Sequence, residues 1–197
     1  MGLISNGTTI FDNGAMASGF GGSMVFISSA TASSSASIEF TLGSYKEYKF
    51  FWVNCHPATN TQEFRFNLST DNGSNYNVVK TTTTFTASQD ESGGNTGLAY
   101  ASGSDLAQGT GDQAISVVTG NDNDACTSGY LHLFNPSSTT FVKHFLAQSS
   151  TYRSDIQMNY NWFTGGYANT TSALTNIKFN FASGNIDDGK ILMFGIN

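Results

Sequence analysis

Three histidines and two cysteines are the residues of this chain best suited to nucleophilic or metal chemistry. His56 follows Cys55 directly in the stretch NCHPAT (54–59), and an imidazole beside a thiol can activate it as a nucleophile. Neighbouring residues on a strand point to opposite faces, however, which places these two side chains badly for proton transfer. The sequence also has no G-x-S-x-G nucleophile elbow. We therefore expect no enzymatic activity and assign no catalytic residue.

His132 and His144 lie on two segments that a turn could join into a hairpin. The segments are YLHLF (130–134) and FVKHFLA (141–147), with NPSSTT between them. A register that sets the two imidazoles directly opposite each other would let them bind a metal ion together. Because no cysteine or carboxylate lies nearby in the sequence, we expect a histidine pair on a polar or intersubunit face, with no metal site and no cofactor.

The stretch GNDNDACTSG (120–129) has the oxygen-rich composition of a calcium-binding loop. An EF-hand loop needs a glycine at its sixth position and a bidentate glutamate at its twelfth, and neither falls into place here. As a bare loop it could still hold calcium. Asn and Asp also favour turns, because their side chains bond their own backbone, and we expect a plain turn between strands.

Four aromatic residues could stack on sugar rings if they lay on the face of a sheet, namely Trp52, Tyr160, Trp162 and Tyr167. Both tryptophans occur in alternating apolar segments, where packing in a core is the commoner role. A module that binds a glycan is therefore an alternative to the main interpretation.

The elements that carry these residues have the period-2 pattern of β-strands. In EFRFNLS (63–69) every second residue is apolar, and NIKFNF (176–181) and DIQMNYNWF (155–163) repeat the pattern. About ten such segments follow one another at a spacing of roughly 8–12 residues, which is typical of an all-β domain. We expect an antiparallel β-sandwich of jelly-roll-like type, with no helix longer than about three turns.

The chain divides into an arm and one domain. Residues 1–22 are rich in Gly and Asn and form the N-terminal arm, and residues 23–197 form a single β-sandwich domain. A Gly-, Ser- and Asp-rich stretch at 86–113 breaks the strand pattern, and we expect a long loop insertion there. Within it, LAYASGSDLA (98–107) could form a helical turn or two.

Charge is scarce in this chain of 197 residues: Asp, Glu, Lys and Arg make up 11% of it, against roughly 25% in an ordinary soluble domain. The net charge of -6 and the eight scattered basic residues argue against nucleic-acid binding. The N-terminus lacks the features of a signal peptide, and no apolar run approaches the ~20 residues of a membrane helix. We therefore expect synthesis in a cytoplasm, no membrane partner, and reduced thiols at Cys55 and Cys126.

Three segments are apolar on both faces, whereas a lone sandwich buries only the inner face of each sheet. They are YKFFWVN (48–54), FVKHFLA (141–147) and KILMFGI (190–196). Loops or the arm could fold over their outer faces. Our main interpretation is that other chains cover them, so that the protein is a homo-oligomer. The residues that we expect at this interface are Phe51, Val53, Phe194 and Ile196.

Four stretches carry a resemblance to known proteins: GLISNGTTIFDNGAM, YKFFWVNCHPAT, LHLFNPSSTTFVKHF and ANTTSALTNIKFNFASGNIDDGKILMFGI. Over nearly its full length the chain resembles small β-sandwich virion proteins of tailed phages, especially phages of marine and cyanobacterial hosts. The last stretch is the most telling, since many phage head and tail accessory proteins end on a turn followed by a strand of this type.

The resemblance implies a non-enzymatic virion structural protein, first of all a capsid decoration (cement) subunit. A tail or fibre-base component is the nearest alternative. The implied partners are further copies of the chain, with a trimer favoured, and other virion proteins such as the major capsid protein. No binding residue is carried over, because the shared motifs are structural.

Overall fold

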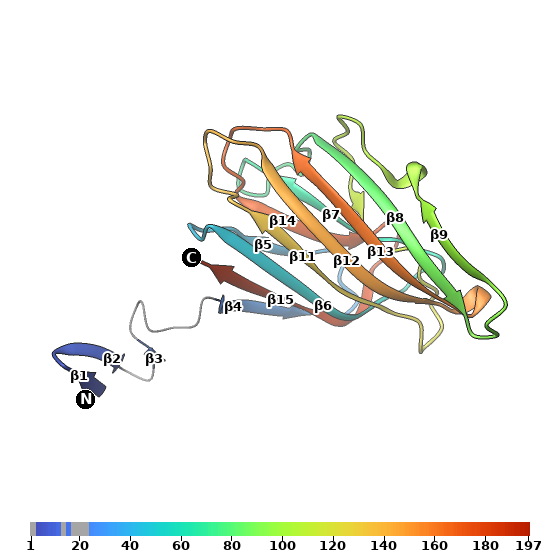
Figure 1. The fold of residues 1–197 in the computed structure, drawn as a ribbon, viewed down its shortest axis with the longest axis horizontal. Helices are drawn as coiled ribbons and strands as arrows, with labels where there is room; N and C mark the ends of the chain where they lie inside the picture. The colour runs from blue at the N-terminus through green and yellow to red at the C-terminus, as the bar shows by residue number, and fades with distance from the viewer. Residues whose placement is uncertain (1–2, 13–14, 17–23) are drawn as a thin grey trace.

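A computed structural model describes residues 3–12, 15–16 and 24–197 of the chain. Within this part the protein is built from β-strands in three antiparallel sheets (Figure 1). The largest sheet has eight strands, in the order β4 (Met24–Thr31), β15 (Ile186–Ile196), β6 (Glu47–Pro57), β11 (Thr127–Phe134), β12 (Lys143–Arg153), β13 (Met158–Ala168), β8 (Lys80–Asp90) and β9 (Thr96–Tyr100). The second has four strands, in the order β10 (Gln113–Ala114), β7 (Phe64–Ser69), β14 (Asn176–Phe181) and β5 (Ile38–Thr41).

The eight-stranded and four-stranded sheets pack face to face, which confirms the predicted all-β sandwich. The described residues form no α-helix, and their only helical turns are the two 3-10 turns η1 (Ser102–Ser104) and η2 (Ser154–Ile156). The two sheets of the sandwich hold twelve strands, against the ten or so expected. The jelly-roll part of the expectation stays a prediction.

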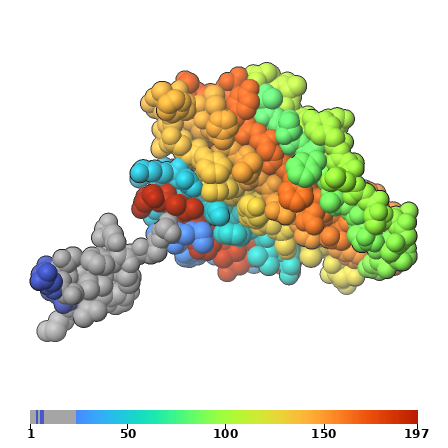
Figure 2. Space-filling model, in the orientation of Figure 1, coloured from blue at the N-terminus to red at the C-terminus, as the bar shows by residue number. Residues whose placement is uncertain are grey.

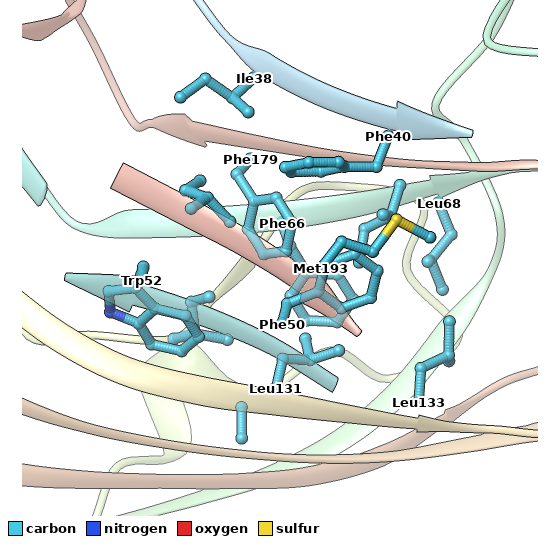
Figure 3. Packing of buried hydrophobic residues seen from close by; sticks show 14 of the residues in the cluster. Ile38, Phe40, Phe50, Trp52, Phe66, Leu68, Leu131, Leu133, Phe179 and Met193 are labelled. Atoms are coloured by element: carbon cyan, nitrogen blue, oxygen red, sulfur yellow. The ribbon is translucent and has the colours of Figure 1, made fainter. Parts of the chain in front are cut away.

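An aromatic core fills the space between β6 and the four-stranded sheet. Phe64 on β7 is the centre of this core, with ring centroids 5.6 Å from Trp52 on β6 and 5.1 Å from Phe181 on β14. Phe50 on β6 and Phe179 on β14 meet across the two sheets with centroids 5.5 Å apart (Figure 3). These side chains are fully or almost fully buried, so the alternation read in the sequence gives the inner face of each sheet directly.

Beneath β8 and β13 the interior is polar. Thr82 on β8 donates a hydrogen bond of 2.7 Å from its hydroxyl to Oε1 of Gln113, and Nε2 of Gln113 donates to the carbonyls of Ser104 and Ala114. Trp162 on β13 is buried there and donates from Nε1 to the hydroxyl of Thr164. Because these buried groups satisfy one another, this part of the sandwich can be polar without leaving the groups unpaired.

The segment at 86–113 differs from the long loop expected. Its first residues continue β8 to Asp90, and Thr96–Tyr100 turn back as β9, the edge strand of the eight-stranded sheet. The chain then makes the turn η1 and returns to the four-stranded sheet as β10. The turn residues between Asp90 and Thr96 thus close a hairpin, which extends the sheet instead of interrupting it.

Of the predicted arm at 1–22, the structure describes residues 3–12 and 15–16. They form a small sheet of β1 (Leu3–Ser5), β2 (Thr8–Asp12) and β3 (Ala15–Met16), with no strand pairing to the sandwich. The other residues of the arm lie outside the described part of the chain. Within the described ranges, no helix is long and apolar enough to cross a membrane.

Candidate interaction surface

The outer face of the eight-stranded sheet carries a row of aromatic side chains from four neighbouring strands. Phe194 on β15 lies at its centre, with ring centroids 5.5 Å from Phe26 on β4 and 5.7 Å from Phe51 on β6. Phe51 in turn lies 6.4 Å from Tyr130 on β11. Phe194 meets Phe26 and Phe51 edge to face, whereas Phe51 and Tyr130 are tilted toward each other, and no second layer of the sandwich covers these rings on this side.

The row continues beyond β11 into a shallow hollow. Phe85 on β8 and Phe163 on β13 stack with centroids 4.7 Å apart and planes 7° from parallel. Together with Tyr130 and Leu146 they line a depression above Gly165, which lies opposite Leu146 and has no side chain to fill it. We call the combined set the apolar belt: Phe26, Phe51, Phe85, Tyr130, Leu146, Phe163 and Phe194. Figure 2 shows this face, with β15, β6, β11, β12, β13, β8 and β9 following one another across it.

The four residues expected at an interface all lie on this face, spread along two strands. Strands β6 and β15 are neighbours, with Phe51 opposite Leu192 and Val53 opposite Lys190. Val53 is 46% exposed, while Phe51, Phe194 and Ile196 are half-buried against the rings and strands beside them. Whether another chain covers them stays a prediction.

Three strongly exposed residues of the belt were not singled out in the sequence. Phe26 and Leu146 are each 55% exposed and Phe85 is 47% exposed. Leu146 belongs to FVKHFLA, which is apolar on both faces, and its buried neighbours Phe145 and Ala147 fix it on the outer face. Phe26 lies in the apolar run 24–27, and Phe85 is the one large apolar residue among the threonines of β8. Neither pattern tells an outward position apart from a core position.

The two histidines on the hairpin do not lie directly opposite each other. The register pairs His132 with Leu146, so His144 is offset along β12 by two residues from the expected position. His132 instead makes a contact of 2.6 Å from Nε2 to Oε2 of Glu47 on β6, and the exposed His144 lies beside Tyr167. Across the described residues, no three or more His, Cys, Asp or Glu side chains gather in a way that could hold a metal ion.

Cys55 and His56 occupy opposite faces of β6, as their adjacency predicted. Cys55 is fully buried, and this burial is the main reason that its thiol pKa rises to about 12. His56 approaches the loop at 120–129, with Nε2 3.1 Å from the carbonyl oxygen of Asp122, and its Nδ1 lies 3.8 Å from the carboxylate of Asp187. A thiol with so high a pKa is a poor nucleophile near neutral pH.

The oxygen-rich loop at 120–129 is tied down by protein contacts. The hydroxyl of Ser154 donates a hydrogen bond of 2.6 Å to Oδ2 of Asp122, and the backbone N–H of Asn121 donates to Oδ1 of Asn60. These contacts fix the loop against the turn between β12 and β13 and against the loop between β6 and β7. The side-chain oxygens that a calcium ion would need are partly engaged already, which favours the turn interpretation.

Neither tryptophan is available to stack on a sugar. Trp52 is 1% exposed and Trp162 is 4% exposed, and both point into the sandwich. Tyr160 and Tyr167 are half-buried on β13. The rings of the apolar belt, which are phenylalanines and Tyr130, do face outward, and their close ring-to-ring packing suits an apolar protein surface.

Comparison with known proteins gives no relative: no protein-family model, no curated protein and no solved structure matches this chain.

Proposed function

We propose that this protein is a non-enzymatic structural subunit of a phage virion, a capsid decoration (cement) protein that acts as a homo-oligomer. The observation that carries the proposal is the apolar belt on the outer face of the eight-stranded sheet. Monomeric proteins rarely expose a contiguous apolar patch larger than a few hundred Å². The belt crosses most of a sheet of eight strands, and its exposed members include Phe26, Phe85 and Leu146.

The energetics of covering the belt support self-association. Burial of ~800 Å² per subunit at ~25 cal/mol per Å² gives a gross gain on the order of 15–20 kcal/mol. The loss of translational and rotational freedom costs roughly 4–15 kcal/mol. The gain can therefore exceed the cost, provided that most of the buried area is apolar.

The virion setting is supported by the resemblance and by the charge pattern. A chain with 11% charged residues has few charged side chains that must lose their bound water when two protein surfaces meet. Further copies of this chain, as a trimer, and the major capsid protein are the partners that we propose. The buried positions of Trp52 and Trp162 make a glycan-binding role the weaker alternative.

Two measurements test the proposal. Sedimentation of the purified chain at micromolar concentration should show a species larger than its 21.0 kDa monomer. Cryo-microscopy of the phage particle should then show sandwich-shaped density on the capsid surface, with the eight-stranded sheet turned toward a neighbouring protein. A stable monomer with no affinity for the particle would contradict the proposal, and density on the tail would favour the tail alternative.

A further inference from the structure

A fully buried lysine contacts a side-chain amide in this sandwich. Lys80 begins β8 and is 0% exposed, and its Nζ lies 2.6 Å from Oδ1 of Asn67 on β7. Its other hydrogen bond goes to the backbone carbonyl of Val78, at 2.8 Å. Buried lysines usually pair with a carboxylate, so an amide as the nearest side-chain partner calls for an explanation.

The carboxamide of Asn67 is held rigidly and polarised. Its Oδ1 accepts a hydrogen bond of 2.9 Å from the backbone N–H of Leu68, in addition to the contact with Lys80. Its Nδ2 lies 2.8 Å from the carbonyl oxygen of Tyr76 and 3.1 Å from that of Thr110. A donor placed on Oδ1 stabilises negative charge there if a nucleophile attacks the amide carbon.

A carboxylate lies on the other side of this amide. Oδ1 of Asp112 is 2.8 Å from Nδ2 of Asn67, and Oδ2 of Asp112 accepts a hydrogen bond of 3.0 Å from Asn180. Lys178 lies 3.8 Å from the same carboxylate. Asp112 is therefore fixed against the nitrogen atom that would depart if the amide of Asn67 were cleaved.

The environment also favours the nucleophilic form of Lys80. Burial lowers the pKa of its ammonium group to about 8, and the charge of Lys178 acts in the same direction while Asp112 opposes it. A lysine with such a pKa has a usable fraction of neutral amine near neutral pH, as lysine nucleophiles require.

We propose that Lys80 and Asn67 react to form an intramolecular isopeptide bond, with Asp112 as the catalytic acid–base group. Neutral Nζ attacks Cγ of Asn67, and the bond from Nζ to Cγ forms while the bond from Cγ to Nδ2 breaks. One proton of Nζ passes to the carboxylate of Asp112 and from there to Nδ2, which departs as ammonia. Asp112 ends ionised as it began, and no atom is oxidised or reduced.

The bond joins the two sheets of the sandwich. Lys80 belongs to the eight-stranded sheet and Asn67 to the four-stranded sheet, so the link would prevent these strands from separating. Such a covalent cross-link limits the conformational freedom of the unfolded chain in the way that a disulfide does. The reaction needs no partner chain, and it is therefore independent of the function proposed above.

Lys143 supplies a matched control. It is also 0% exposed, and its Nζ donates a hydrogen bond of 2.9 Å to the backbone carbonyl of Thr170. Burial lowers the pKa of Lys143 as well. The two lysines differ in that Lys80 faces a primary amide with an aspartate behind it.

The test is intact-mass spectrometry of the full purified chain, followed by tandem spectrometry of a digest. We expect a mass lower than that of the sequence by one ammonia, and one cross-linked peptide pair that joins Lys80 to Asn67. Lys80→Met and Asp112→Asn should each restore the full mass, and Lys143→Met should leave the ammonia loss unchanged. The Asp112→Asn variant keeps both reacting residues, so it tests the reaction even if Lys80→Met fails to fold.

Two results would overturn the proposal. One is an intact mass of the native chain equal to that of the sequence. The other is an ammonia loss that maps elsewhere, for example to a succinimide at Asn72 before Gly73, and that persists in Asp112→Asn.

Discussion

The rings of Phe51 and Phe194 meet edge to face on the outer side of the eight-stranded sheet, with centroids 5.7 Å apart and planes 87° from parallel. Each ring shields part of the other, so the two form the centre of the apolar belt. Interface residues of this kind, aromatic and central, carry most of the binding energy in protein complexes. If the belt is the contact between subunits, loss of either ring should weaken association more than it weakens the fold.

We predict that Phe194→Thr lowers the affinity of self-association about thirtyfold or more, since truncation of a central aromatic residue costs about 2 kcal/mol or more. Thr is chosen because it keeps a high β-propensity. Sedimentation velocity over a range of concentrations measures the effect. Phe141→Thr is the control, because Phe141 is 66% exposed in the turn before β12 and lies outside the belt. Equal dissociation constants for the two variants would place the interface elsewhere.

Gly129 on β11 is predicted to tolerate no side chain. A Cβ there would lie 2.2 Å from the carbonyl oxygen of Gln148 and 2.6 Å from Cζ2 of Trp52. Gly129→Ala should therefore force the strand that carries Gln148 or the ring of Trp52 to move. We expect this to destabilise the protein by about 1–3 kcal/mol, the usual cost of overpacking. Denaturant unfolding measures the change. Gly103→Ala in η1, where a Cβ meets nothing within 4 Å, should change stability little; a similar loss in both variants would contradict the packing explanation.

The strands could be predicted from the sequence where inward and outward residues alternate. EFRFNLS and NIKFNF became β7 and β14, with Phe64, Phe179 and Phe181 in the core as the pattern indicates. The partners of each strand could not be predicted. Asn72 and Gly73 form a turn with positive φ, yet the strands on either side of it, β7 and β8, belong to different sheets. Residues such as Asn and Gly determine where the chain reverses its direction. The packing of the two sheets determines which strand the next segment pairs with.

The sequence predicts one of the two proposed sites, the apolar belt, but not the other, the cluster of Lys80, Asn67 and Asp112. Segments apolar on both faces indicated the interface around Phe51 and Phe194, because an outward apolar residue breaks the expected alternation. Lys80, Asn67 and Asp112 gave no signal, since each is an ordinary residue on a different segment. Only the packing of the two sheets, together with the segment that returns to β10, brings the three side chains into contact.

The two cysteines are free thiols in the structure and should differ in reactivity. Burial raises the pKa of Cys55 to about 12, and the pKa of the half-buried Cys126 is raised by burial and by the charge of Asp124. A thiol reagent at neutral pH should therefore modify Cys126 slowly and Cys55 not at all until the protein unfolds. Thiol titration in denaturant without reductant should then find both groups. If neither thiol reacts until reductant is added, the cysteines form a disulfide and the prediction is wrong.

Asp71 closes the turn after β7 and should make the protein sensitive to acid. Its carboxylate accepts hydrogen bonds from the side-chain amide of Asn75, from the hydroxyl of Ser69 and from the backbone N–H of Asn75. These bonds, the side-chain bond from Asn75 first, lower its pKa from 3.8 to about 2. Because the folded state holds the proton less tightly than the unfolded state, the contribution of Asp71 to stability is complete above pH 3.8 and is lost as the pH falls through about 2.

Asp71→Asn should therefore be less stable than the parent protein at neutral pH, and the difference should shrink as the pH approaches 2. Urea unfolding of both proteins at neutral pH, and again at a series of acidic pH values, measures the two differences. Asp124→Asn is the matched control, because it removes the same charge from another exposed loop. A stability difference for Asp71→Asn that stays constant over this range would show that the carboxylate hydrogen bonds do not hold the turn closed.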